Sequence, residues 1–202
     1  MQTSTQRDRL LYGSLFSFIR SQMVFRIKVP KDRIGVLIGH SGETLSKLKE
    51  ESGTEIDVDS ETGEVTIFDD EASDSYKAFR MRDVVRAIAR GFTPEKASKL
   101  LEEDLYYEEF DIRDYSGKSQ KRIMQVRSRV IGSGGKTRRI VEELTDCHIS
   151  IKGNTVGIIG DLEGLKVASK AVTMLLSGSE HSSVYSYMEK KRKDLKIARW
   201  GM

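Results

Sequence analysis

Two glycine-bracketed loops are the residues in this chain whose types and spacing best suit binding chemistry. The first loop is Gly39-His40-Ser41-Gly42, and the second is Gly132-Ser133-Gly134-Gly135. Glycine has no Cβ, so a glycine-rich backbone can approach a ligand closely. Each loop leads into a helical pattern, and the free N–H groups and positive dipole end of a helix N-terminus attract phosphate. The sequence therefore predicts two places that can hold a phosphate group.

The second loop has the more favourable charge. Lys136, Arg138 and Arg139 follow it, and Arg127 and Arg129 lie on the helical segment before it. Residues 112–139 hold nine basic side chains and one acidic side chain, and a cluster of that density usually faces an anion. We predict that this loop and its cations form the stronger anion-binding site. A solvated corner between two helices is the alternative.

The first loop is less favourable for binding an anion. Glu43 follows it directly, residues 23–90 carry 14 acidic side chains against 11 basic ones, and neither loop has Lys or Arg between its glycines. His40 is mostly neutral at pH 7. Arg33, on the preceding segment, is a cation that could contact nucleic acid, so nucleic-acid binding by this loop remains possible. The alternative is a copy that docks a protein or has only a structural role.

Catalytic and metal-binding arrangements are not supported. Gly134-Gly135-Lys136-Thr137 ends like a nucleoside-triphosphate-binding P-loop, but Val130 stands where that motif needs glycine, and a helix rather than a strand precedes it. The acidic runs at 50–51, 102–104 and 108–109 could suggest a metal-dependent nuclease. Adjacent acids on a helix point to different faces, so a solvated surface is the simpler interpretation. One cysteine, Cys147, and three separated histidines give no metal-ligand or nucleophile set. We expect a protein that is not an enzyme and needs no metal or cofactor.

The segments around the two loops repeat as well, which identifies one structural unit present in two copies. Each copy has a strand pattern, a helix, the loop, a second helix, two strands joined by a turn, and a long helix. In the first copy the outer strands and long helix fall at 24–29, 55–59, 65–68 and 72–90; in the second, the strands, the basic helix and the long helix fall at 110–113, 118–131, 148–152, 155–159 and 163–176. Helices packed on antiparallel sheets predict an α+β class.

The remaining segments complete the expected organisation. We divide the chain into an N-terminal arm (1–22), a first unit (23–90), a helical linker (91–107), a second unit (108–178) and a basic C-terminal tail (179–202). Thr93 and Pro94 suit the start of a linker helix, which should run to about Leu105. The tail is either a phosphate-binding extension or a solvated helix end. Tyr185 and Tyr187 are expected to pack on the second unit, with stacking on bases as the alternative.

No targeting or membrane segment is expected. The apolar run 10–19 lies between Arg9 and Arg20 and loosely resembles a signal peptide, but no small-x-small cleavage site follows it. No apolar run approaches the roughly 20 residues that a membrane-spanning helix needs. The single cysteine fits a reducing compartment. We therefore expect a cytoplasmic protein.

Each unit resembles a type I KH domain, a fold that clamps about four nucleotides of single-stranded nucleic acid with this kind of loop. The resemblance covers about residues 23–90 and 108–178. It implies a three-stranded antiparallel sheet with three helices in each unit. It also implies a groove whose far wall is the strand containing Ile149, Ser150 and Ile151, with aliphatic side chains under the bases and the strand backbone at the base edges.

Three further segments, at 90–97, 111–115 and 184–195, narrow the resemblance to one family. They are similar to the archaeal and eukaryotic KH-domain ribosomal RNA assembly factor, the partner of the small-subunit maturation endonuclease. This resemblance implies binding of single-stranded RNA near the 3′ end of the small-subunit ribosomal RNA precursor. It also implies contact with that endonuclease, with the ribosomal RNA adenosine dimethyltransferase as a further candidate partner.

Two alternatives remain open at this point. One is a protein scaffold whose first unit docks a nuclease or methyltransferase and whose contact with RNA is secondary. The acidic balance of residues 23–90 favours this alternative. The other is a KH-domain regulator of other RNAs, such as messenger RNA. The segments outside the two units argue against this second alternative.

Overall fold

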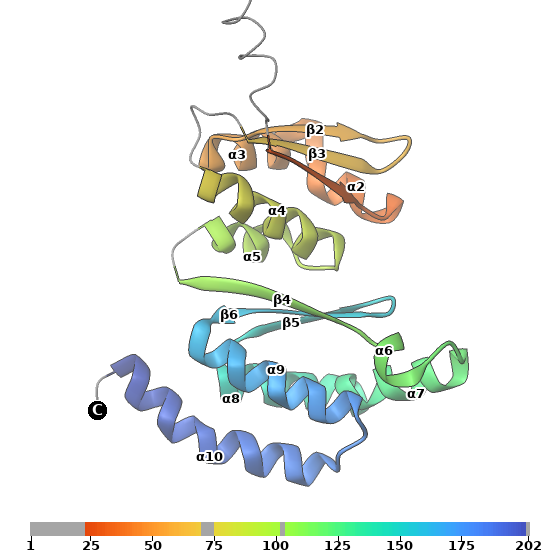
Figure 1. The fold of residues 1–202 in the computed structure, drawn as a ribbon, viewed down its shortest axis with the longest axis vertical. Helices are drawn as coiled ribbons and strands as arrows, with labels where there is room; N and C mark the ends of the chain where they lie inside the picture. Colours follow the sequence, from red (N-terminus) through yellow and green to blue (C-terminus); the bar gives the residue numbers. More distant parts are fainter. Residues whose placement is uncertain (1–22, 70–74, 102–103, 201–202) are drawn as a thin grey trace, which may run out of the picture.

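The computed structural model describes residues 23–69, 75–101 and 104–200. The predicted N-terminal arm at 1–22 lies outside the described residues. In the described part of the chain, sheets and helices alternate in layers: the first sheet, helices below it, the second sheet, further helices, and finally α10 (Figure 1).

The first domain runs from β1 to α4 and has a three-stranded antiparallel sheet of order β1-β3-β2. Its elements are β1 (Met23–Lys28), α2 (Lys31–Ile38), the 3₁₀ turn η1 (His40–Gly42), α3 (Glu43–Ser52), β2 (Glu55–Asp59), β3 (Glu64–Asp69) and α4 (Ser75–Ala89). Val65 of the central strand pairs with Ile27 on one side and Val58 on the other. This places an apolar stripe against α2 and α4, where Leu37, Ile67 and other side chains are fully buried.

The second domain, from β4 to α9, repeats this topology with sheet order β4-β6-β5. Its elements are β4 (Leu105–Asp111), α6 (Arg113–Ser116), α7 (Gln120–Ile131), the turn η3 (Ser133–Gly135), α8 (Lys136–Thr145), β5 (His148–Lys152), β6 (Thr155–Asp161) and α9 (Leu162–Leu176). The predicted α+β class is therefore confirmed, with a three-stranded antiparallel sheet in each copy.

The linker and the first strand of the second copy differ from prediction. The linker helix α5 (Pro94–Ser98) and the 3₁₀ turn η2 (Lys99–Leu101) end earlier than expected, and Leu105 opens β4 instead of closing a helix. β4 pairs with β6 along its whole length, from Leu105 opposite Asp161 to Asp111 opposite Thr155. Acidic side chains interrupt the apolar alternation of β4, so its sequence does not predict a strand of this length. The sequence also does not reveal that one of these acids, Glu109, pairs with arginines of the first domain.

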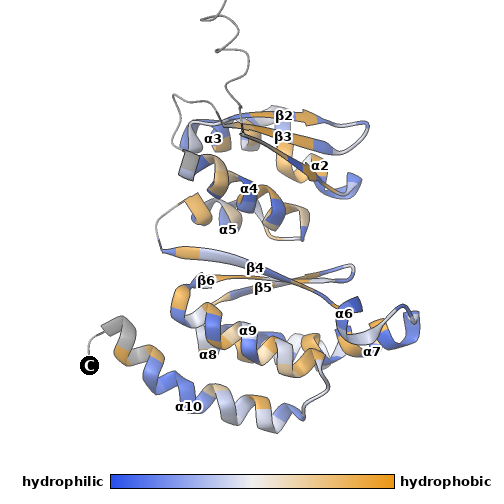
Figure 2. Cartoon of the chain, viewed as in Figure 1, coloured by the Kyte–Doolittle hydropathy of each residue, from blue (hydrophilic) through white to orange (hydrophobic). Residues whose placement is uncertain are grey.

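The C-terminal tail forms one helix, α10 (His181–Trp200), which packs against α8 and α9. Val184, Met188 and Leu195 are buried in the core of the second domain, and Tyr185 and Tyr187 pack beside them, as predicted. Hydrophilic residues predominate along the middle of α10 (Figure 2). The helix thus binds the second domain by one face and leaves a basic face in solvent.

The second sheet is covered on both of its faces. Helices α7 to α9 cover one face, and α4 with the residues after it covers the other (Figure 1). Ile159 of β6 belongs to the apolar core of the first domain. Gly157 lies directly against the Phe92 ring, because a Cβ at this position would lie 2.9 Å from that ring. Ser150 Oγ–H donates to the backbone carbonyl of Arg90 (2.8 Å). The two domains therefore share a packed interface.

Glu109 on β4 supplies the charged part of this interface. Arg86 Nη2 and Arg90 Nε approach its carboxylate to 2.7 and 3.3 Å, and Tyr107 O–H donates to it over 2.7 Å. Burial alone would raise the pKa of Glu109, but the hydrogen bonds from Arg86 and Tyr107 and the nearby arginine charges hold that pKa below its usual value. Burial also raises the pKa of the Tyr107 hydroxyl. The ionised carboxylate is thus the form that joins α4 to β4.

We predict that Glu109→Gln lowers the free energy of unfolding by about 1–3 kcal/mol at pH 7, since hydrogen bonds to a charged group lose their charge assistance. Urea unfolding followed by circular dichroism measures this. Because the folded-state pKa of Glu109 lies below the unfolded value, its contribution is complete above about pH 4.3 and is lost as the pH falls through the folded-state pKa. The gap between wild type and variant should close over that acidic range. Glu143→Gln, at an exposed site on α8, removes the same charge and serves as the control; a gap that is independent of pH would contradict this account.

Candidate nucleic-acid interface

The two glycine-bracketed loops have the same backbone shape. Positive φ angles of 77°, 51° and 84° occur at Gly39, Ser41 and Gly42, and angles of 72°, 57° and 79° occur at Gly132, Gly134 and Gly135. The third position therefore requires a left-handed conformation, which glycine adopts without strain and Ser41 does not. The difference between the two copies lies in their side chains and charges, because their loop shapes are alike.

The first glycine of each loop touches a threonine at the start of the next helix. A Cβ on Gly132 would lie 2.6 Å from the backbone nitrogen of Thr137, and a Cβ on Gly39 would lie 2.8 Å from that of Thr44. Real atoms cannot approach so closely, so these glycines are needed for the close packing of loop on helix. The sequence has a threonine at the same position in both copies, but it does not reveal that the first glycine of the loop packs against this residue.

The last glycines face open space. A Cβ at Gly42, Gly134 or Gly135 would meet no atom within 4 Å. These positions lie at the N-terminal end of α3 and α8, the positive end of each helix dipole. The N–H groups of Gly42 and Gly135 donate within their loops to the carbonyls of Gly39 (3.4 Å) and Gly132 (3.2 Å). A phosphate group can therefore reach the backbone at Gly134 and Gly135 in the second loop and at Gly42 in the first.

Three cations of α8 follow the second loop. Lys136 is exposed and forms no ion pair with any residue that the structure describes. Arg139 Nη2 donates to the carbonyl of Gly134 (3.0 Å), which holds the guanidinium against the loop, and Arg138 Nε lies 3.5 Å from Glu142 Oε2. Of these three cations, Lys136 is unpaired among the described residues, Arg139 is held at the loop, and Arg138 pairs with Glu142 along α8.

The two arginines before the second loop have different positions. Arg127 Nη1 donates to the carbonyl of Gly153 (3.3 Å) in the turn between β5 and β6, so it faces the strand side of α7. Arg129 donates to the carbonyls of Leu175 (3.4 Å) and Ser179 (2.5 Å), on the side of α7 that faces α10. Of this predicted pair, the structure brings only Arg127 toward the strand that should form the groove wall.

That strand, β5, offers its backbone more than its side chains. The Ile149 side chain is buried at 4% exposure, and the Ser150 hydroxyl is engaged with Arg90 of the other domain. The backbone N–H of Ile149 points away from β6 and donates to Glu142 Oε1 (2.8 Å). Ile151 presents its backbone N–H and carbonyl in the same direction, since pairing alternates along an antiparallel edge strand. A base edge can therefore be read by this strand only through its main chain.

The predicted residues of the first loop are less well placed for an anion. His40 and Ser41 are exposed at the loop, but the lysines of α3 pair with carboxylates: Lys47 with Glu51 (3.6 Å) and Lys49 with Glu55. Arg33 does not reach the loop. Its Nε donates to the carbonyl of Ile88 (2.8 Å), where burial lowers its pKa. Arg33 therefore anchors α2 to the end of α4.

Two side chains of α10 lie beside the second loop: His181, which sequence reasoning missed, and Tyr185, which it expected on the second unit without placing it at the loop. Tyr185 O–H lies 3.1 Å from Thr137 Oγ1, and His181 Nε2 lies 3.0 Å from the carbonyl oxygen of Arg129. The signal that could have found them, a tyrosine and a histidine four residues apart on one face of a helix, carries no information about its target. Among residues 23–69, 75–101 and 104–200, no three His, Cys, Asp or Glu side chains group as metal ligands, and no helix is long and apolar enough to cross a membrane.

Comparison with known proteins matches both domains. The family model described as eukaryotic type KH-domain (KH-domain type I) matches residues 106–193, and the model described as KH domain matches residues 24–79. A KH domain-containing protein of Methanocaldococcus jannaschii is 42% identical over 175 residues, which are 86% of this chain and 76% of that protein. The RNA-binding protein pno1 of Drosophila melanogaster is 30% identical over 165 residues, 79% of this chain and 68% of that protein.

A solved structure is similar over nearly the whole chain. It is the complex of a/eIF2alpha, aDim2p and rRNA from Pyrococcus horikoshii, whose matching chain has 40% sequence identity and a TM-score of 0.80. The match covers 90% of this chain and 99% of that chain. Both domains are thus present in these relatives in the same arrangement along the chain.

We predict unequal effects of alanine at two glycines of the second loop. Gly132→Ala should cost about 3 kcal/mol or more, because it adds a close contact with Thr137 to an unfavourable φ. Gly134→Ala should cost only about 1–2 kcal/mol, because its side chain enters open space and only the left-handed strain remains. Chemical denaturation of both variants measures the difference; equal losses would mean that the packing on Thr137 does not stabilise the loop.

Proposed function

Because this chain belongs to the family of archaeal and eukaryotic two-KH-domain ribosomal RNA assembly factors, we propose that it binds single-stranded RNA near the 3′ end of the small-subunit ribosomal RNA precursor. The observation that carries the proposal is the open glycine backbone of the second loop, Gly134 and Gly135, at the N-terminus of α8 beside the exposed Lys136. The similar protein of Pyrococcus horikoshii, whose structure is that of a complex with rRNA, supports the choice of RNA.

The mechanism is capture of the RNA backbone, followed by reading of the bases. The positive end of the α8 dipole, with Lys136, Arg138 and Arg139, holds phosphate, which sets the register without sequence information. The bases then lie between α7 and β5, where the backbone of Ile149 and Ile151 meets their edges. In the unbound protein the Glu142 carboxylate accepts the hydrogen bond from the Ile149 N–H. A base edge therefore replaces that carboxylate when RNA binds.

The first loop makes the weaker contact with the same RNA. Its backbone has the same shape and the same open space at Gly42. However, Glu43 follows the loop and the lysines of α3 are paired with carboxylates. Like charge and paired cations reduce the attraction for phosphate. RNA held at the second loop brings the adjoining strand close to the first, where a weak contact then suffices.

The protein itself performs no chemical step in this proposal. It holds the RNA in the cytoplasm in a form that the maturation endonuclease can cut, and the ribosomal RNA adenosine dimethyltransferase is a further partner. An exposed aromatic surface on the first domain suits a protein partner: Phe79 of α4 is 45% exposed, stacks edge-on with Phe25 at 6.4 Å, and has the Arg82 guanidinium 3.8 Å above its ring. Aromatic and arginine side chains are enriched at interface centres.

The RNA proposal predicts that Gly134→Asp with Gly135→Asp lowers affinity for a fluorescent RNA copying the 3′ end of small-subunit ribosomal RNA about 100-fold or more. The aspartates occupy the open space and repel phosphate, removing several charge-assisted hydrogen bonds. Fluorescence anisotropy at two salt concentrations, with a scrambled RNA beside it, measures the loss.

The matched control is Ser41→Asp with Gly42→Asp, which makes the same kind of change in the first loop and should cost less. Comparable losses from both pairs would contradict the ranking of the two loops. Weak binding that is equal for both RNAs and unchanged by either pair would leave only non-specific electrostatic attraction, and would favour the protein scaffold.

The partner proposal predicts that Phe79→Ala weakens capture of the maturation endonuclease of the same organism about tenfold or more, because an interface anchor is removed. The pull-down uses purified proteins, with RNase and high salt to remove RNA bridges. Tyr115→Ala, an exposed aromatic on α6, is the control. Capture that disappears on RNase treatment of the wild type would show that RNA, rather than this surface, joins the two proteins.

A further inference from the structure

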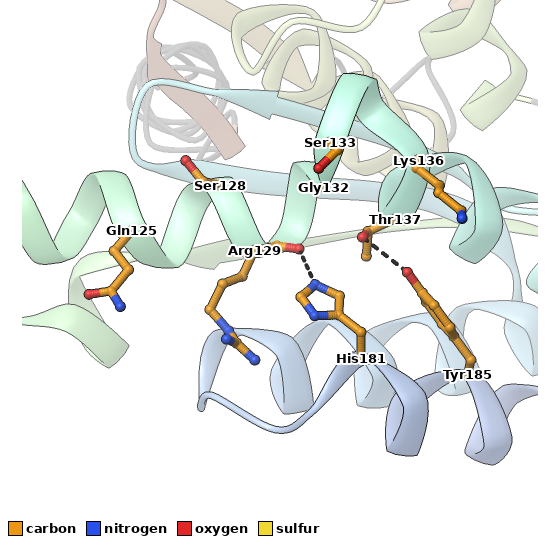
Figure 3. Close-up of a pocket in the computed structure, with 9 residues that line it drawn as sticks. All are labelled: Gln125, Ser128, Arg129, Gly132, Ser133, Lys136, Thr137, His181 and Tyr185. Atoms are coloured by element: carbon orange, nitrogen blue, oxygen red, sulfur yellow. Dashed lines mark hydrogen bonds between the residues drawn. The ribbon is translucent and has the colours of Figure 1, made fainter.

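A pocket of about 500 Å³ lies beside the second loop, on the side of α7 that faces α10 (Figure 3). It is therefore separate from the groove wall at β5. Its residues come from α7, the loop, the first turn of α8 and α10: Gln125, Ser128, Arg129, Gly132, Ser133, Lys136, Thr137, His181 and Tyr185. Helix α10, which lies outside the repeated unit, closes this side of the loop with His181 and Tyr185.

The chemistry of this lining suits an anion with hydrogen-bonding groups. None of the nine residues is acidic, while Arg129 and Lys136 bring two cations. Hydroxyl groups of serine, threonine and tyrosine, an amide and an imidazole make up the other polar groups. Such a mixture can bind phosphate and also contact the polar edges of a base.

The wall formed by α10 is aromatic and held in place. The rings of His181 and Tyr185 extend from α10 toward the loop, with their centroids 6.2 Å apart (Figure 3). Each is attached to the loop region by its polar end, His181 at the carbonyl of Arg129 and Tyr185 at the Thr137 hydroxyl. Fixed rings bind a base with little loss of conformational freedom. The pocket volume also falls within the roughly 300–1,000 Å³ of small-molecule sites.

We infer that this pocket binds the nucleotide next to the segment that the second loop holds, with its phosphate toward Lys136 and Arg129 and its base against the rings of His181 and Tyr185. Helix α10 is then part of the RNA site, and the second domain holds a longer RNA segment than its groove alone. The inference rests on the proposed function, since the loop must first bring the RNA backbone to the mouth of the pocket.

The test measures RNA length dependence. The tightest-binding tetranucleotide within the 3′-end RNA is compared by fluorescence anisotropy with versions extended by two nucleotides at the 5′ end or at the 3′ end. For the wild type we expect extension at one of these ends to raise affinity about 5-fold to 150-fold, the usual effect of one base stacked on an aromatic side chain. In Tyr185→Leu that increment, taken relative to the affinity of the same variant for the tetranucleotide, should largely disappear.

Two matched controls separate pocket from fold. Tyr187→Leu makes the same change on another face of α10 and should keep the increment. Gln125→Glu adds a negative charge to the pocket at an exposed site and should reduce the increment even if Tyr185→Leu lowers stability, whereas Gln120→Glu adds that charge on α7 outside the pocket and should not.

The outcomes distinguish the two proposals. An increment that is equal in wild type, Tyr185→Leu and Gln125→Glu, or no increment at either end, would overturn the pocket assignment and leave the loop as the RNA site. A wild-type protein that binds neither the tetranucleotide nor the extended RNAs would overturn the proposed function, and the pocket assignment with it.

Discussion

The packing of the first domain on the outer face of the second sheet is the constraint on which the rest of this structure depends. A three-stranded sheet covered by helices on one face leaves its other face to water or to a partner. Here α4 and Phe92 cover that face, and Gly157 makes room for the ring. Burial of Ile159 supplies apolar stabilisation, while the charged contacts of Glu109 fix the direction of approach. The two loops are consequently carried by one packed body, and the linker does not set their separation.

This arrangement also explains which predicted groove residues remain available to a ligand. Because β5 belongs to the covered sheet, the Ser150 hydroxyl is engaged by the first domain and Lys152 pairs with Asp32 of α2. The free edge of β5 and the open end of the loop are what the interface leaves exposed. Arg33 shows the same effect in the first domain, where carbonyls at the end of α4 engage its guanidinium. The interface therefore uses cations and hydroxyls that a reading of the sequence would assign to RNA.

Much of the fold could be predicted because it is repeated. Two loops with the same surrounding pattern confirm each other, and local periodicity located most strands and helices within a few residues. The sequence failed where a residue's role depends on a distant partner. Glu109 looks like a solvated acid until Arg86 and Arg90 are placed beside it, and for that reason β4 was predicted too short. Arg129 and Arg127, two residues apart, look equivalent in sequence, but helix geometry turns them to opposite sides of α7.

The two copies show how one backbone can carry different binding strengths. Both loops need glycine where a Cβ would strike the threonine of the next helix, and both keep the last glycine open. The copies differ at the third loop position, where Gly134 adopts a left-handed conformation freely and Ser41 is strained, and at the next residue after the loop, Lys136 against Glu43. These differences leave the packing of each domain unchanged, because they lie in open space. Affinity for an anion could thus diverge between the copies without cost to the fold, and helix α10 adds an aromatic wall to the copy whose charge already favours phosphate.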